Sequence, residues 1–272
     1  MKRIFSLALI CALAGNVFAQ TVKETRNVSD FTGLDVSGVF TVELKKGPVS
    51  SVVIEAEARY MEYIFTEVGS GVLRLYTKFP NRLRIDNKST LKAYITISEL
   101  NSLELSGVSS LTTTDLFTPS RFRLELSGVS SVSGLRIQTD DAYLEASGTS
   151  KFNLSGTIRQ AKIDLSGVSQ SNCNLKSEQV DIDISGTSKL VMQGEANKVT
   201  MDISGVSSVS ADSFTIQKLD FSASGASKAS VYVSESLSIR LSGASSLNYK
   251  GKPELIESRI SSGSSVNGQR RE

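Results

Sequence analysis

A ladder of acidic residues recurs through the middle of the sequence at intervals of 19 to 21 residues. Carboxylates beside serine hydroxyls are hard oxygen ligands that suit Ca²⁺. Two carboxylates about 5 Å apart also serve retaining glycoside hydrolysis. Six equivalent positions single out no catalytic pair, so the pattern favours a solvated strand face, with a cation or ligand ladder as the alternative. The members of this acidic ladder are Glu104, Glu125, Glu145, Asp164, Asp183 and Asp202.

A second ladder consists of serines, one in each repeat of the sequence. A serine nucleophile needs an activating base and an oxyanion hole. Ser89 and Lys92 have the Ser-x-x-Lys spacing of penicillin-binding enzymes, but they begin a strand-like run and no Lys-Thr-Gly follows. We therefore predict that the serine hydroxyls bond turn backbone. They are Ser109, Ser130, Ser150, Ser169, Ser188, Ser207, Ser227, Ser245 and Ser264.

The residue types that are missing exclude most catalytic and metal chemistry. The sequence has no histidine, which excludes Ser-His-Asp triads and histidine-ligated metals. Its two cysteines, Cys11 and Cys173, cannot form a cysteine-rich zinc site. Phosphate-binding loops, dinucleotide fingerprints and nucleophile elbows are also lacking. We predict no enzyme, no cofactor and no resident metal.

The element that positions both ladders is a Ser-Gly-x-Ser repeat with a spacing of 18 to 21 residues, which is typical of a solenoid. Apolar residues stand two, four and six positions before each glycine and resume after it, as in strands with one buried face. Each copy is predicted to be strand, tight corner and strand, closed by a loop such as 194–197. The structural turn glycines are Gly107, Gly128, Gly148, Gly167, Gly186, Gly205, Gly225 and Gly243, with Ser262 in the ninth slot.

The repeats predict one all-β domain, a single-stranded parallel β-helix with coils of about 18–21 residues, over residues 20–272. Residues 20–100 are expected to be irregular coils that cap the rod, 101–266 the regular repeats and 267–272 a polar tail. Within the first part, strands are predicted over 34–39, 51–58, 72–78 and 91–97, with one helical turn at 59–65. Ile256 is expected in the buried column of the last copy.

The first nineteen residues are typical of a secretory signal peptide cleaved after Ala19, with Lys2 and Arg3 before an apolar run too short to span a bilayer. Cleavage leaves 28 basic and 28 acidic residues, which argues against a nucleic-acid partner. It also leaves Cys173 as the single cysteine, so no internal disulfide is expected. We predict an exported protein that is not transmembrane and lies in the periplasm, on the outer-membrane surface or outside the cell.

Recurrent Ser-Gly-(Val/Thr/Ala)-Ser turns in an exported β-helix, after an irregular strand-rich start, resemble the putative auto-transporter adhesin, head GIN domain family over residues 28–262. The resemblance implies a right-handed, pectin-lyase-like solenoid from a bacterium and an adhesin-like role at the cell surface. It supplies no catalytic residues.

Three functions are consistent with these features. The first is non-enzymatic binding of a glycan, a surface polymer or a protein. The second is a carbohydrate-active β-helix enzyme that uses ladder carboxylates, which requires an asymmetric cleft and shifted carboxyl pKa values. The third is a structural self-assembly module, which would form homo-oligomers.

Overall fold

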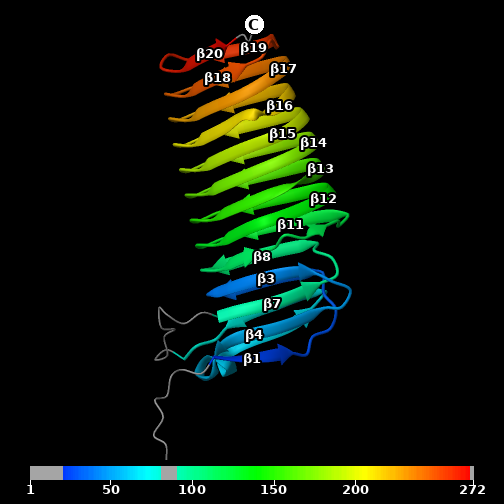
Figure 1. Ribbon diagram of the computed structural model, residues 1–272. Coiled ribbons are helices and arrows are strands. Elements are labelled where there is room, and N and C mark those ends of the chain that lie inside the picture. Colours follow the sequence, from blue (N-terminus) through cyan, green and yellow to red (C-terminus); the bar gives the residue numbers. More distant parts are fainter. Residues whose placement is uncertain (1–20, 81–90, 270–272) are drawn as a thin grey trace, which may run out of the picture.

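The computed structural model describes residues 21–80 and 91–269, and it is almost entirely β (Figure 1). In the regular part, each coil is one bent strand of 14 to 16 residues followed by a Ser-Gly-x-Ser turn. Successive strands pair in parallel and stack into a solenoid of about nine turns. The predicted all-β parallel β-helix is confirmed. These strands are β12 (Ser131–Ala146), β13 (Lys151–Leu165), β14 (Gln170–Ile184), β15 (Lys189–Ile203), β16 (Ser208–Ala223) and β17 (Lys228–Leu241).

The prediction of a loop at 194–197 is wrong. These residues lie within β15, where Gly194, Glu195 and Ala196 pair with successive residues of β14. The coil instead turns its second corner without leaving the strand, where two successive side chains such as Asn197 and Lys198 both face solvent. The polar composition of such a corner resembles that of a loop, although the backbone hydrogen bonds between strands continue through it.

The first part of the chain contains one full coil. Strands β2 (Gly33–Gly38) and β3 (Phe40–Lys46) are joined at Gly38 and stack in parallel on β8 (Ser102–Gly107) and β9 (Ser110–Thr112). Strand β8 continues to β11 and β9 continues to β12, so both sides of the solenoid start from this coil. The remaining short strands here are β10 (Leu116–Phe117) and β11 (Arg121–Leu126).

Beyond that coil one further parallel pair forms on each side before the strands reverse direction, in contrast to the expected irregular coils. On one side, β7 (Leu91–Ile97) pairs in parallel with β3, and β4 (Ser51–Glu57) and β1 (Thr21–Arg26) then extend the sheet in antiparallel pairs. On the other side, β6 (Val72–Thr77) pairs in antiparallel fashion with β5 (Ile64–Gly69).

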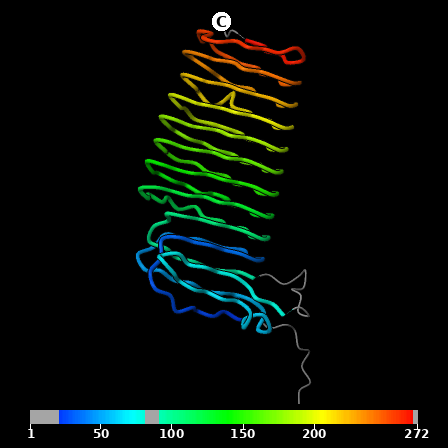
Figure 2. The backbone as a smooth tube through the Cα atoms, turned by 180° about the vertical axis from the view of Figure 1, so that it is seen from behind, coloured from blue at the N-terminus to red at the C-terminus, as the bar shows by residue number. Residues whose placement is uncertain are grey.

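A short 3₁₀ helix, η1 (Ala58–Tyr63), crosses between the two sides and buries Tyr60 and Met61 over the end of the core. The predicted strands and the predicted helical turn of this part are confirmed to within a few residues. This end of the rod is therefore covered by backbone that no longer follows the coil (Figure 2).

The opposite end of the rod is formed by β18 (Ser246–Lys250), β19 (Glu254–Ile260) and β20 (Ser265–Gln269). A bulge after Leu237 places Leu255 opposite it, so the prediction that Ile256 occupies the buried column is wrong. One extra residue in a strand shifts every following side chain to the other face. The expected polar tail also differs, because 267–269 belong to β20. Residues 1–19, with the predicted signal peptide, lie outside the described residues, as do 270–272.

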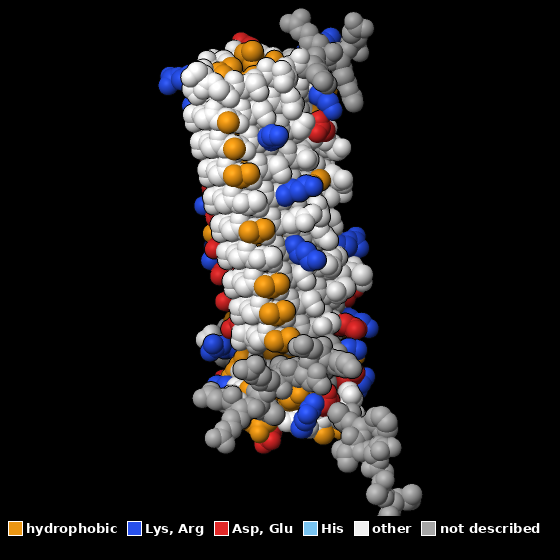
Figure 3. All heavy atoms as spheres, turned by 90° about the vertical axis from the view of Figure 1, so that its left-hand side faces the viewer, with side chains coloured by type: hydrophobic (Ala, Val, Ile, Leu, Met, Phe, Trp, Pro, Cys, Tyr) orange, Lys and Arg blue, Asp and Glu red, His pale blue; other side chains and the backbone are white. Residues whose placement is uncertain are grey.

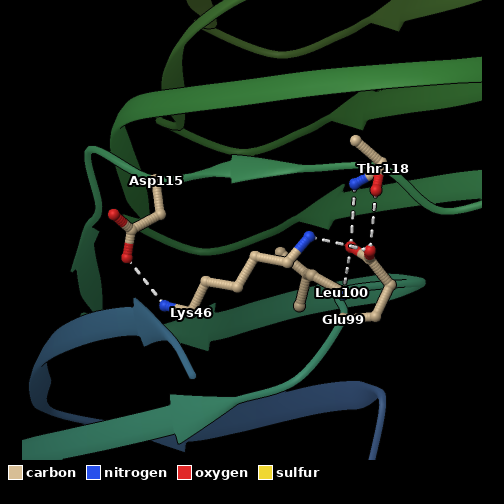
Figure 4. Close-up of polar contacts among 5 residues, drawn as sticks. All are labelled: Lys46, Glu99, Leu100, Asp115 and Thr118. Atoms are coloured by element: carbon tan, nitrogen blue, oxygen red, sulfur yellow. Dashed lines mark hydrogen bonds and ion pairs between the residues drawn. The ribbon is translucent and has the colours of Figure 1, made fainter. Parts of the chain in front are cut away.

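A polar cluster, the Glu99 clamp, joins the first coil to the stack above it (Figure 4). Glu99 accepts hydrogen bonds from the amino group of Lys46 at 3.0 Å, from the backbone of Leu100 and Thr118, and from the Thr118 hydroxyl. The backbone N–H of Lys46 donates to Asp115 at 2.7 Å. Three segments far apart in the sequence therefore meet at one carboxylate.

Candidate functional site: the ladder groove

The register of the strands brings all six members of the acidic ladder into one column. Each carboxylate is paired with the next, from Glu104 through to Asp202. Asp35 extends the column before Glu104, and Ser222, Arg240 and Arg259 continue it after the acidic part. Asp35 stands three residues before Gly38, as each ladder residue stands before its turn glycine. This spacing was the signal that could have assigned Asp35 to the ladder.

Part of the acidic ladder is compensated by neighbouring cations. Arg74 lies 3.2 Å from Asp35, and Lys162 lies 3.5 Å from Asp164. Arg123 pairs with Glu125 on the same strand. Within the described parts of the chain, Asp183 and Asp202 form no ion pair. The ion pairs of the acidic residues therefore lie at Asp35, Glu125 and Asp164, and the middle of the ladder at Asp183 and Asp202 stays negative.

Asp183 is the ladder residue whose proton affinity is most affected by its surroundings. Partial burial raises the pKa of its carboxyl, and the neighbouring charges of Asp164 and Asp202 raise it further against the opposing effect of Lys162. Like charges on neighbouring strands repel when they are not compensated. The middle of the ladder is thus a place where an incoming cationic or hydrogen-bonding group would relieve repulsion.

Tyr143 lies beside the ladder between Glu145 and Asp164, and its hydroxyl contacts both carboxylates. Its hydroxyl lies 2.8 Å from the Asp164 carboxylate and 3.0 Å from the Glu145 carboxylate. The Arg123 guanidinium lies over the Tyr143 ring, 4.5 Å from the ring centroid. The hydrogen bond to Asp164, then burial, then the bond to Glu145 raise the pKa of the phenol well above its ordinary value. The sequence analysis missed Tyr143, whose only signal was its outward position two residues before Glu145.

A groove of about 570 Å³ runs along the solenoid axis beside the ladder. It crosses seven stacked strands, from β12 to β17 and on to β19, which corresponds to about 30 Å at the usual strand spacing. Glu104 and Glu125 lie outside it. One wall is the ladder and the other is the first serine of each turn. We name this feature the ladder groove; its charged lining residues are Glu145, Asp164, Asp183, Asp202, Arg240 and Arg259.

The two ends of the ladder groove are lined by different charged side chains. At the basic end Arg240 contacts Asp220, donates to Glu257 at 2.9 Å and donates to Ser222 at 3.3 Å. Arg259 lies 2.7 Å from the same Glu257. These partners hold the guanidiniums in place. The groove therefore offers fixed donors at one end and acceptor carboxylates at the other.

The turn glycines have a structural role, because each turn needs a positive φ and a close approach of backbone from the neighbouring coil. All eight predicted turn glycines have φ between 68° and 75°. A Cβ added to Gly186 would lie 2.4 Å from the carbonyl oxygen of Gly167, which accepts a hydrogen bond from Thr187. In the last turn Ser262 follows the register of Gly243, but the positive φ is moved to Gly263.

Six of the repeat serines donate their hydroxyl to the carbonyl three residues earlier, as in the 2.9 Å bond from Ser188 to Ser185. This is the turn-bonding role expected for them. The others in this set are Ser109, Ser130, Ser169, Ser227 and Ser245. Of the Ser-x-x-Lys pair, Ser89 lies outside the described residues and Lys92 lies on β7, 3.9 Å from Glu55. Cys173 is buried, and burial raises the pKa of its thiol to about 12.

A second regular face lies at the turns themselves. The residue after each turn glycine is exposed, and many of these residues are apolar, as at Val129, Val168 and Val206. Figure 3 shows them as an apolar stripe down one edge of the rod, with basic side chains beside it. In the described residues no three acidic or cysteine side chains come close enough together to hold a metal ion. The ladder is thus a row of carboxylates rather than a cage.

The sequence of residues 30–174, and again of 167–253, matches the family model described as putative auto-transporter adhesin, head GIN domain. The chain belongs to this family. The head GIN domain protein has no significant match among curated proteins. Among the residues that the structure describes, no helix has the length and apolar character needed to cross a membrane.

Solved structures with the same fold come from Parabacteroides. A protein from P. distasonis ATCC 8503 described as a putative adhesin has 19% identity and a TM-score of 0.70, covering 93% of this chain and 98% of its own. A putative adhesin from P. merdae ATCC 43184 has 12% identity and a TM-score of 0.71, with coverage of 93% and 97%. A P. distasonis protein described as a putative lipid binding protein has 14% identity and a TM-score of 0.64, with coverage of 93% and 98%. At these identities the likeness concerns the fold.

Proposed function

We propose that this head GIN domain protein is a non-enzymatic exported binding protein that holds an extended partner along the ladder groove. The observation that carries the proposal is the shape and charge of the groove, which crosses seven strands and changes from carboxylates to guanidiniums along its length. An elongated site of this kind fits a chain-like ligand, such as a glycan, a surface polymer or an extended protein segment. Family membership supports an adhesin-like role at a surface.

The chemistry of the groove is suited to binding by hydrogen bonds and charge. Carboxylates and serine hydroxyls accept and donate to sugar hydroxyls, and the paired guanidiniums of Arg240 and Arg259 suit carboxylate or phosphate groups. Export is supported by the signal-like residues 1–19 and by the family.

A carbohydrate-active enzyme remains the second candidate because of one observation. The hypothesis required an asymmetric cleft with a shifted carboxyl pKa, and the ladder groove contains Asp183, whose pKa is raised. Asp183 is flanked on both sides by equivalent carboxylates of Asp164 and Asp202, however, so no unique acid and nucleophile pair is defined. This symmetry favours binding over cleavage.

The test is to incubate the purified protein with a panel of polysaccharides and matrix proteins, with and without Ca²⁺, while measuring binding and released reducing ends. The groove variant is Asp202→Lys, and the matched control is Glu235→Lys on the far corner of β17. We expect binding without cleavage, a loss of more than about tenfold in affinity for Asp202→Lys and no change for the control. Ca²⁺ dependence would assign the acidic ladder as a cation site.

Release of reducing ends that Asp183→Asn abolishes would replace the binding proposal with the enzyme. Binding that survives Asp202→Lys but is lost in variants of the apolar stripe, such as Val168→Lys, would move the site to the turn edge. Absence of binding across the whole panel would contradict the proposal for these ligand classes.

A further inference from the structure

The two ends of the solenoid are finished differently. At the first end, η1 covers the core, and the outer strand β1 carries charged side chains such as Lys23, Glu24 and Arg26. At the other end the last described strands are β19 and β20, which within the described residues pair with β17 and β18. Figures 1 and 2 show this coil as the last one of the described stack.

The last coil leaves apolar side chains in solvent. Leu255 is 51% exposed, Ile256 62% and Ile260 45%, whereas Leu237, the residue opposite Leu255 one coil earlier, is fully buried. Figure 3 shows apolar side chains gathered at this end of the rod. An unpaired strand edge with exposed apolar residues is a template for pairing with another chain.

A second copy of the same end matches this edge better than the opposite end does. The first end presents the charged strand β1, so stacking of one molecule on the next in the same direction would bury lysine, glutamate and arginine against isoleucine and leucine. When two identical ends pair about a two-fold axis, the assembly is complete with two molecules.

Of the three antiparallel registers centred on Glu257, Ser258 or Arg259, the charges of β19 favour the one centred on Ser258. When Ser258 lies on the two-fold axis, Arg259 stands opposite the partner subunit's Glu257 and its own Glu257 opposite the partner subunit's Arg259. A shift that centres the pair on Arg259 places two arginines opposite each other, and a shift to Glu257 places two glutamates opposite each other. Like charges directly opposite are unfavourable in antiparallel pairs, whereas opposite charges stabilise them.

We propose that two copies of this chain associate through their last coils, with β19 of each pairing in antiparallel fashion about Ser258. The contact continues the sheet from one molecule into the other and covers Leu255, Ile256 and Ile260 of both. The basic ends of the two ladder grooves then face each other across the interface. The assembly is a closed dimer, about twice the length of one rod.

The register is tested by cysteine cross-linking in an exported chain that carries Cys11→Ser, so that the buried Cys173 is the remaining native thiol. Directly opposite residues of an antiparallel pair have Cα atoms about 4.5 to 5.5 Å apart, which is within disulfide range. Ser258→Cys is expected to give a covalent dimer on mild oxidation. The control Ser261→Cys lies on the same coil but opposite Leu255 of the partner subunit, and it is expected to stay largely uncross-linked.

The association itself is measured by analytical ultracentrifugation of the native chain over a range of concentrations. We expect a dimer whose dissociation constant rises more than about tenfold with Ile260→Lys and with Arg259→Glu, while the stripe variant Val168→Lys leaves it unchanged. Circular dichroism checks that each variant keeps its β structure, and Arg259→Glu supplies an answer if Ile260→Lys fails to fold.

A strict monomer at the highest soluble concentration would overturn the proposal. So would a dimer that both β19 variants leave intact, or one in which Ser258→Cys fails to cross-link. Loss of ligand binding in the groove variants affects none of these results, because those variants lie away from β19.

Discussion

The hydroxyl of Tyr143 donates a 2.8 Å hydrogen bond to Asp164, which lies one coil further along the solenoid. The same hydroxyl lies 3.0 Å from Glu145 on its own strand. One phenol has one proton, so it satisfies these two carboxylates in turn rather than together. Tyr143 therefore ties β12 to β13 at the point where two ladder carboxylates would otherwise face each other alone.

Tyr143→Phe is expected to lower the free energy of unfolding at pH 7 by about 1 kcal/mol, because two carboxylates lose their shared donor. The folded chain raises the pKa of this phenol above its ordinary 10.0, so the stabilisation is present below pH 10 and is lost as the pH rises above it. Denaturant unfolding at pH 7 and at high pH checks both points. The control is Tyr232→Phe, since the Tyr232 hydroxyl makes no hydrogen bond in the described residues; an equal loss there would contradict the assignment.

The turn glycines allow backbone strain to be separated from steric clash. Gly69 has ordinary φ and open space around it, Gly71 has a φ of +74° with open space, and Gly186 has a φ of +73° with backbone in the way. We expect the free energy of unfolding to be unchanged in Gly69→Ala, to fall by about 1 kcal/mol in Gly71→Ala, and to fall by at least about 2 kcal/mol in Gly186→Ala. Gly186→Val should be at least as damaging as Gly186→Ala.

Thermal and urea unfolding of the four variants measures this series. Equal losses for Gly71→Ala and Gly186→Ala would show that the stacked carbonyl of Gly167 moves aside at little cost. An unchanged stability of Gly186→Val would show that the turn does not need its permissive residue.

The coils could be predicted from the sequence, because a glycine corner and apolar residues with a period of two recur at nearly constant spacing. The reversal of β4 and the bulge at Ile256 could not be predicted from the sequence. Both depend on which strands meet at an end of the rod, where no further copy enforces the pattern. The continuous strand at 194–197 was missed for a different reason, because a solvated corner and a loop have similar composition.

The candidate site could be predicted only in part. The ladder residues followed from the register of the repeats, but the groove and the partner of each carboxylate did not. Arg74 reaches Asp35 across 39 positions of sequence, and Tyr143 reaches Asp164 across 21. Such contacts depend on the stacking of coils and leave no local pattern.

Asp183→Asn should be neutral or stabilising by less than about 1 kcal/mol at pH 7, because it removes a charge from an exposed, repelling row. Burial and the carboxylates of Asp164 and Asp202 raise the pKa of Asp183 above 3.8 in the folded chain. Ionisation therefore costs stability as the pH rises from 3.8 through the raised value, and the penalty persists at higher pH. The advantage of the variant should disappear near pH 3.

Urea unfolding of wild type, Asp183→Asn and the control Glu235→Gln across this pH range checks the sign. A clear loss of stability in Asp183→Asn at pH 7 would indicate that the carboxylate holds a bound cation or partner.

The Glu99 clamp should give the junction between the first coil and the stack an acid-sensitive contact. Burial raises the pKa of Glu99, but hydrogen bonds from Lys46, Leu100 and Thr118 outweigh it, so the pKa lies below the ordinary 4.5. The contribution of this carboxylate is therefore present above pH 4.5 and is lost as the pH falls through the lowered value.

Glu99→Gln is expected to cost about 1 to 2 kcal/mol at pH 7, because charge-assisted hydrogen bonds are replaced by weaker ones. Hydrogen exchange should accelerate at the backbone amides of Leu100 and Thr118, whose acceptor is weakened. Glu43→Gln, an exposed change on the same strand as Lys46, is the matched control. If both variants lose the same stability, or if these two amides keep their protection, the clamp does not hold the first coil to the stack.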